Sequence, residues 1–103
     1  MSEVIYEVNL DIDAGIAAEY RSWLHAHGAQ MLALPGFIDA QLHDVVDPAP
    51  AAGRIVICTR YRLRDAAALQ AYFDQYAERM RGDGIARFAG RFSATRRVLQ
   101  AAG

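Results

Sequence analysis

Residues 55–63 read Ile55-Val56-Ile57-Cys58-Thr59-Arg60-Tyr61-Arg62-Leu63, the longest stretch of the chain that is typical of a β-strand. β-Branched and aromatic residues dominate it, as they do in strands. Because successive side chains of a strand point to opposite faces, Ile57, Thr59 and Tyr61 share one face and the two arginines lie on the other. One face therefore needs a hydrophobic cover, whereas the other needs ionic partners or water.

Three further stretches predict strands around this one. Residues 4–10 alternate between apolar and polar side chains, and residues 37–46 and 92–99 do so more weakly. Such alternation is typical of half-buried strands. The proline-bearing residues 47–53 then form the loop of a hairpin.

Two stretches carry apolar residues at helical spacing. Residues 16–34 follow Asp11 and Asp13, which can cap a helix, and residues 65–80 begin with Asp65 as N-cap. Pro35-Gly36 ends the first helix. We expect Gly82-Asp83-Gly84 to break the second, with one more turn over residues 85–88 that Asp83 caps.

The resulting order is β-α-β-β-α-β in a single domain over residues 1–103. Right-handed crossovers place the first and third strands at the centre of an antiparallel sheet, with both helices on one face, which is the α+β ferredoxin-like arrangement. The uncovered face carries charged residues, and two such faces meeting would bury them as pairs. We therefore predict a homodimer in which Glu7 or Asp39 lies opposite Arg60 or Arg62.

Composition restricts the class of protein. The chain has 103 residues, 53% of them hydrophobic and 22% charged, as in an ordinary globular domain. It has no apolar run near the ~20 residues that span a bilayer, and no leader peptide is visible. A single cysteine fits a reducing cytoplasm. RNA-recognition domains share the topology, but their base-stacking aromatics lie on the uncovered face, whereas Tyr6 and Tyr61 have the opposite parity. We thus expect a cytoplasmic protein that binds neither membrane nor nucleic acid.

Several short motifs resemble a small bacterial domain-of-unknown-function family of the dimeric α/β-barrel superfamily, which includes antibiotic-biosynthesis monooxygenase-like proteins and haem-degrading enzymes. The motifs span nearly the whole chain: Ile5-Tyr6-Glu7-Val8, Trp23-Leu24-x-x-His27, Leu34-Pro35-Gly36-Phe37, Arg60-Tyr61-Arg62-Leu63 and Met80-Arg81-x-x-Gly84-x-x-Arg87-Phe88. The resemblance implies the fold and a dimer, and a site between helices and sheet. It implies no particular activity, because a fold does not determine a function.

His27 is the main candidate for a catalytic residue. It lies in the middle of the apolar stripe of the first helix and could act as a general base. The predicted fold surrounds it with aromatic side chains that would bind a small organic molecule: Tyr6, Tyr20, Trp23, Tyr61, Tyr72 and Tyr76. The competing interpretation is a core histidine whose ring nitrogens are hydrogen-bonded within the protein.

A second candidate site is the group of arginines around Gly82-Asp83-Gly84, namely Arg79, Arg81, Arg87, Arg91, Arg96 and Arg97. Glycines at a helix start can present amide groups to an anion. A solvated basic surface, partly paired with the acidic N-terminal half, explains the same residues and is favoured. No metal or cofactor is expected: His25 and His27 are two apart on a helix and diverge, and Cys58 has no second cysteine.

Two functional hypotheses remain. The first is a homodimer that binds a small organic ligand between helices and sheet, with cofactor-free oxygenase or isomerase-type chemistry through His27. The second is a non-enzymatic structural or regulatory dimerisation module.

Overall fold

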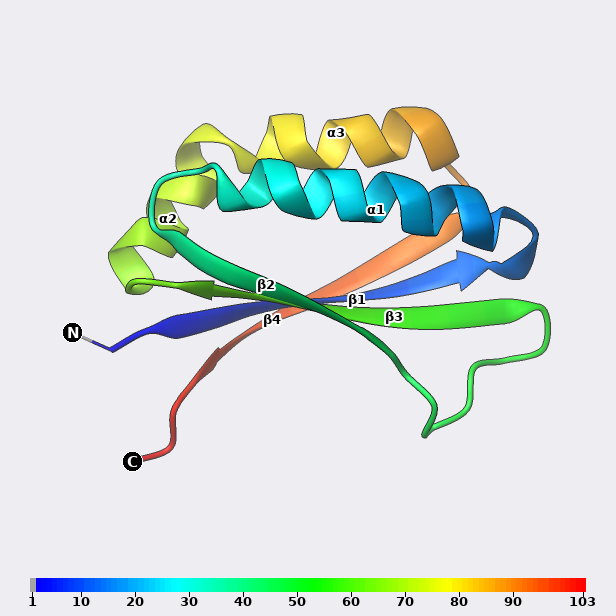
Figure 1. Cartoon of the computed structure of the whole chain (residues 1–103), viewed down its shortest axis with the longest axis horizontal. Coiled ribbons are helices and arrows are strands. Elements are labelled where there is room, and N and C mark those ends of the chain that lie inside the picture. Colours follow the sequence, from blue (N-terminus) through cyan, green and yellow to red (C-terminus); the bar gives the residue numbers. More distant parts are fainter. Residues whose placement is uncertain (1) are drawn as a thin grey trace.

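The computed structural model describes residues 2–103. Its elements follow the order β1 (Val4–Asp13), a 3₁₀ turn η1 (Ala14–Ile16), α1 (Ala17–Leu32), β2 (Phe37–Asp44), β3 (Arg54–Leu63), α2 (Ala66–Gln75), α3 (Ala77–Phe88) and β4 (Phe92–Gln100). The helices all lie on one face of the sheet, and the other face has no covering element in residues 2–103 (Figure 1).

The sheet has the predicted ferredoxin-like topology. Its strand order is β2-β3-β1-β4, with every neighbouring pair antiparallel, so that β1 and β3 are central as predicted. β1 pairs along its whole length with β3, from Val4 opposite Leu63 to Asp13 opposite Arg54. This register determines which side chains meet across the two faces.

The alternation in β1 and β3 sorts their side chains as predicted. Tyr6, Ile57 and Tyr61 each expose only 2% of their surface beneath the helices. The core is completed from above by residues of the three helices, among them Tyr20, Leu24, Met31, Leu69, Tyr72, Met80 and Phe88. One face of the sheet therefore supports the hydrophobic core.

The second helical region differs from the prediction. α2 ends at Gln75, and a new helix, α3, runs without interruption through Gly82-Asp83-Gly84 to Phe88, so the expected break at these glycines is wrong. Non-helical backbone angles at Tyr76 separate the two helices. The physical reason for glycine inside α3 is close packing: a Cβ at Gly84 would lie 2.8 Å from the Trp23 ring of α1.

The predicted cap at Asp65 is confirmed, whereas Asp13 caps the 3₁₀ turn η1 and not α1, and Asp11 binds Arg54 instead. The carboxylate of Asp13 accepts a hydrogen bond from the Gly15 amide, and that of Asp65 accepts one from the Ala68 amide, each at 2.8 Å. Gly36, with φ of 85°, occupies the left-handed region that ends the α1–β2 connection. Asp13 and Gly36 thus mark the turns before and after α1, and between these turns α1 lies against the sheet.

Candidate functional site

The first wall of the site is the inward stripe of α1. Tyr20, Trp23 and His27 follow one another at spacings of three and four, so they line up along one side of the helix. Tyr20 is fully buried, whereas Trp23 and His27 are half-buried. The His27 imidazole stacks on the Trp23 indole with ring centroids 4.6 Å apart and planes 19° apart.

Trp23 is held in place by α3. Its Nε1 donates a 2.8 Å hydrogen bond to Oδ2 of Asp83, and its ring packs on Gly84. Asp83 was expected to cap a new turn, but it lies inside α3 and binds the indole instead. Because Gly84 has no side chain, the Trp23 ring packs closely on it, and the Asp83 carboxylate holds the indole by a hydrogen bond. These two contacts position the ring on which His27 stacks.

The sheet forms the floor of the site. Thr59 donates a 3.1 Å hydrogen bond from Oγ1 to the carbonyl oxygen of Val8. The Tyr6 hydroxyl accepts a 3.0 Å hydrogen bond from Nη2 of Arg81, which reaches over from α3. Burial raises the pKa values of the Tyr20 and Tyr61 hydroxyls to about 12, so both remain neutral hydrogen-bonding groups at neutral pH.

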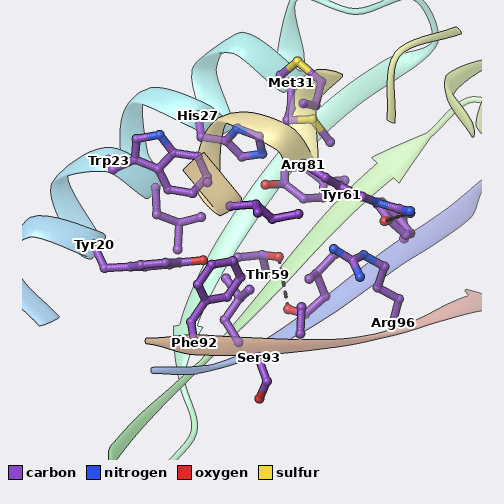
Figure 2. A pocket seen from close by; sticks show the side chains of 18 of the residues that line it. Tyr20, Trp23, His27, Met31, Thr59, Tyr61, Arg81, Phe92, Ser93 and Arg96 are labelled. Atoms are coloured by element: carbon purple, nitrogen blue, oxygen red, sulfur yellow. Dashed lines mark hydrogen bonds between the residues drawn. The ribbon is translucent and has the colours of Figure 1, made fainter. Parts of the chain in front are cut away.

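Between these walls lies a cavity of about 320 Å³ (Figure 2). It is lined from the three helices and from the strands β1, β3 and β4. Its lining includes His27 and all but one of the aromatic residues predicted to bind a ligand: Tyr6, Tyr20, Trp23, Tyr61 and Tyr72. The structure places Tyr76 elsewhere, half-buried at the junction of α2 and α3, with the Arg79 guanidinium 5.6 Å from its ring centroid.

His27 is a half-buried residue of the cavity lining. Its Nδ1 is buried and has no hydrogen-bond partner among the described residues. Burial lowers the pKa of the imidazole, and the nearby Asp83 carboxylate opposes that shift. A neutral imidazole with a free ring nitrogen can accept a proton or a hydrogen bond from a bound molecule. The hydrogen-bonded core histidine considered above would have a partner for this nitrogen.

The arginines that the sequence grouped together are dispersed by the fold. Arg91 pairs with Asp13 at 2.9 Å and Arg97 with Glu7 at 2.6 Å, whereas Arg81 and Arg96 line the cavity. The anion site considered at Gly82-Asp83-Gly84 would need a helix start there, but these residues lie inside α3 and begin no helix. Sequence reasoning missed Arg81 and Arg96 as cavity residues; the strand parity of β4 was the available signal for Arg96.

The opposite face of the sheet carries the residues predicted for a dimer interface. Glu7 lies opposite Arg60, and Asp39 lies opposite Arg62, within the same chain. Arg62 forms ion pairs with both Asp39 and Glu3. The carboxylate of Glu7 is only 3% exposed.

Arg97 from β4 is the principal partner of Glu7, at 2.6 Å, while Arg60 stands 4.0 Å away. The hydrogen bond from Arg97 lowers the Glu7 pKa from 4.5 to about 2; burial opposes this shift, and hydrogen bonds from Asn9 and Cys58 add to it. Glu7 and Asp39, which were predicted to pair with arginines at a dimer contact, have arginine partners within the same chain, and sequence reasoning missed Arg97 as one of them.

Metal ligands, the single cysteine and the helices offer no further candidate site among residues 2–103. Among residues 2–103, no three His, Cys, Asp or Glu side chains come close enough to hold a metal ion. Cys58 lies on the uncovered face, where burial raises the pKa of its thiol and its Sγ donates to Glu7 at 3.4 Å. In the same described range, no helix is long and apolar enough to cross a membrane.

Comparison with known proteins places the chain in a family. The model of the family described as "Domain of unknown function (DUF4286)" matches residues 3–102. The chain belongs to this family. No curated protein matches it in sequence.

Solved structures share the fold of this DUF4286 protein at low sequence identity. SnoaB, a cofactor-independent oxygenase from Streptomyces nogalater, has a TM-score of 0.70 at 18% identity, covering 100% of this chain and 96% of SnoaB. MhuD, a heme-degrader from Mycobacterium tuberculosis, has 0.63 at 19%, covering 97% and 96%. A dimeric ferredoxin-like protein from an uncultured marine organism has 0.62 at 11%, covering 100% and 98%. These likenesses show that the chain has the same ferredoxin-like fold as these proteins.

Proposed function

We propose that this protein binds a small aromatic molecule in the cavity between α1, α3 and the sheet. The observation that supports this most directly is the cavity itself: about 320 Å³, walled by tyrosines and Trp23, with His27 in its lining. Ligand pockets of ~300–1,000 Å³ with apolar walls and few polar groups are the usual small-molecule sites. A fully packed core would leave no such volume.

The chemistry that fits the site is proton abstraction by His27. A neutral imidazole removes a proton from an acidic carbon of the bound molecule and leaves a carbanion stabilised by the aromatic ring. With O₂ as the oxidant, a CH₂ group becomes C=O and the second oxygen atom leaves as H₂O, which needs no cofactor. Return of the proton to another carbon gives isomerisation instead. The likeness in fold to SnoaB, a cofactor-independent oxygenase, favours the first outcome.

Trp23 makes binding directly measurable, because it is the single tryptophan of the chain. Titration with two- and three-ring hydroxyaromatic compounds should change its fluorescence in a saturable way. Ala94 is half-buried and lines the cavity from β4, so Ala94→Phe should fill the volume and abolish the change. Ala86→Phe, at an exposed position of α3, should leave it intact. An unchanged signal across such a panel would contradict the proposal.

We further propose that the uncovered face of the sheet pairs with a second copy of the chain. This face offers half-buried Ile5, Val56 and Leu99 beside charges that are already paired, so a partner would cover apolar surface without stranding a charge. The dimeric ferredoxin-like protein of similar fold supports this arrangement. A dimer without a bound ligand would correspond to the non-enzymatic alternative.

Light scattering tests the dimer. The wild type should have twice the chain mass at micromolar concentration, and Leu99→Asp should shift it to the monomer because a carboxylate would be buried at the contact. Leu32→Asp, on the exposed end of α1, is the matched control and should remain dimeric. A monomeric wild type would refute the pairing.

A further inference from the structure

The cavity is positively charged. Of the residues that line it, Arg81 and Arg96 carry guanidinium groups and none is an aspartate or glutamate. The Asp83 carboxylate lies near Trp23 but is exposed and is not part of the lining. A cation in an apolar setting is costly unless an anion accompanies it.

Other arginines of this chain do have acidic partners. Arg54, Arg62, Arg91 and Arg97 each place a nitrogen within 3.0 Å of a carboxylate. Within residues 2–103, Arg81 and Arg96 form no ion pair, although the chain holds twelve acidic residues. Arg79 and Arg87 also form no ion pair in this range, but they lie on the exposed surface of α3 outside the cavity; of the four arginines without an internal anion, Arg81 and Arg96 line the cavity.

Arg81 has donor capacity left over at the cavity wall. Its Nη2 donates to the Tyr6 hydroxyl at 3.0 Å, a neutral acceptor, and its Nε is buried with no partner among the described residues. A guanidinium presents its N–H groups in a planar fork that matches the two oxygens of a carboxylate. Arg81 and Arg96 both line the cavity together with Tyr72. Their charges act against the rise that burial causes in the pKa of the Tyr72 hydroxyl.

The two ends of the cavity differ in chemistry. Figure 2 shows Tyr20 and Trp23 toward one end, and Arg81 and Arg96 toward the other, with Thr59 and Phe92 between them. Aromatic side chains bind the face or edge of a ring. A ligand with a ring at one end and an anion at the other matches this polarity.

We propose that the ligand is an aromatic carboxylate, with its ring against Tyr20 and Trp23 and its carboxylate bound by Arg81 and Arg96. This inference rests on the proposed binding of an aromatic molecule in the cavity and adds the charge of that molecule. It also gives Arg81 and Arg96 a role as ligand-binding residues.

Calorimetric titration with matched probes tests the charge. 2-Naphthoate and 2-naphthamide have nearly the same shape, but only the first is an anion. The wild type should bind the naphthoate about tenfold more tightly or better, since charge-assisted hydrogen bonds are worth ~1.5–3 kcal/mol. Arg96→Gln and Arg81→Gln should each remove most of this preference while leaving the affinity for the amide unchanged.

Arg87→Gln is the matched control, because Arg87 is an exposed arginine of α3 outside the cavity and its loss changes the net charge equally. It should retain the preference. Equal binding of the two probes to the wild type would overturn the charge assignment and leave the proposed function standing. Binding of neither probe would overturn both. Because Arg96 is exposed, Arg96→Gln should fold even if Arg81→Gln does not.

Discussion

Arg96 and Arg97 are neighbours on β4, yet they serve opposite faces of the sheet. Arg97 lies on the uncovered face and binds the buried carboxylate of Glu7 at 2.6 Å. Arg96 points toward the helices, lines the cavity and has no acidic partner within residues 2–103. The uncovered face thus satisfies its charges within the chain, whereas the helix-side face has polar groups without protein partners beside a cavity. Paired charges contribute to stability, and unpaired groups at a cavity are available for a ligand.

Replacing each of the two arginines by alanine, in separate variants, should give the largest difference in stability between the two faces. Arg97→Ala leaves the Glu7 carboxylate buried with only Arg60 at 4.0 Å and weaker donors nearby. We expect this variant to lose more free energy of unfolding than any other substitution discussed below, because a buried carboxylate is left without its main partner. Arg96→Ala should change it by less than about 0.5 kcal/mol, because no ion pair is lost. Urea denaturation of both variants measures the difference; equal losses would show that the two faces do not differ in this way.

Acid titration of the Glu7 pair gives the next largest effect. The Glu7 pKa is about 2 in the folded chain against 4.5 as its ordinary value, so its contribution is present above pH 4.5 and is lost as the pH falls toward 2. We expect a contribution of about 2 kcal/mol, below the full linkage value because the Arg97 partner is exposed and screened by salt. The stability of the wild type should therefore fall more steeply than that of Glu7→Gln in this range. Parallel curves would contradict the assigned ion pair.

Two glycines of α3 test how the cavity is built. A Cβ at Gly84 would lie 2.8 Å from the Trp23 ring, whereas a Cβ at Gly82 would have no neighbour within 4 Å. Gly84→Ala should lower stability by about 1–2 kcal/mol and shift the Trp23 fluorescence, because the ring is fixed by Asp83 and cannot move freely. Gly82→Ala should raise stability by about 0.5–1 kcal/mol through helix propensity. Thermal unfolding of the pair, followed by tryptophan emission, checks both signs.

The sequence was sufficient for the fold and for one wall of the site. The alternation in residues 55–63 and 4–10 assigns every side chain of the two central strands to its observed face. The spacing of Tyr20, Trp23 and His27 places them together on α1. These signals are local, and local periodicity is what a sequence expresses most clearly.

The rest depended on contacts between distant residues. Gly82 and Gly84 were expected to end a helix. This prediction failed because the packing of Gly84 on Trp23 involves another element and leaves no local pattern in the sequence. Arg81 and Arg96 were assigned to a surface group, since their entry into the cavity depends on the path of α3 and the register of β4. The cavity volume likewise follows from how side chains pack, which periodicity does not express.

Substitution of His27 should have the smallest effect on stability. It also tests most directly whether the polar groups on the helix side of the sheet lack partners. Burial lowers the pKa of its imidazole in the folded protein. The unfolded chain therefore binds the proton more readily, so the stability is present above about pH 6.5 and decreases as the pH falls below that value. His27→Gln should flatten this part of the stability curve, whereas His25→Gln should keep it, because His27 remains. In an NMR titration, the His27 ring signal should have its midpoint below 6.5, and a bound aromatic carboxylate should raise that midpoint by bringing a negative charge into the cavity. A His27 midpoint above 6.5 in the free protein would show that the imidazole is already paired, and it would remove the neutral base from the site.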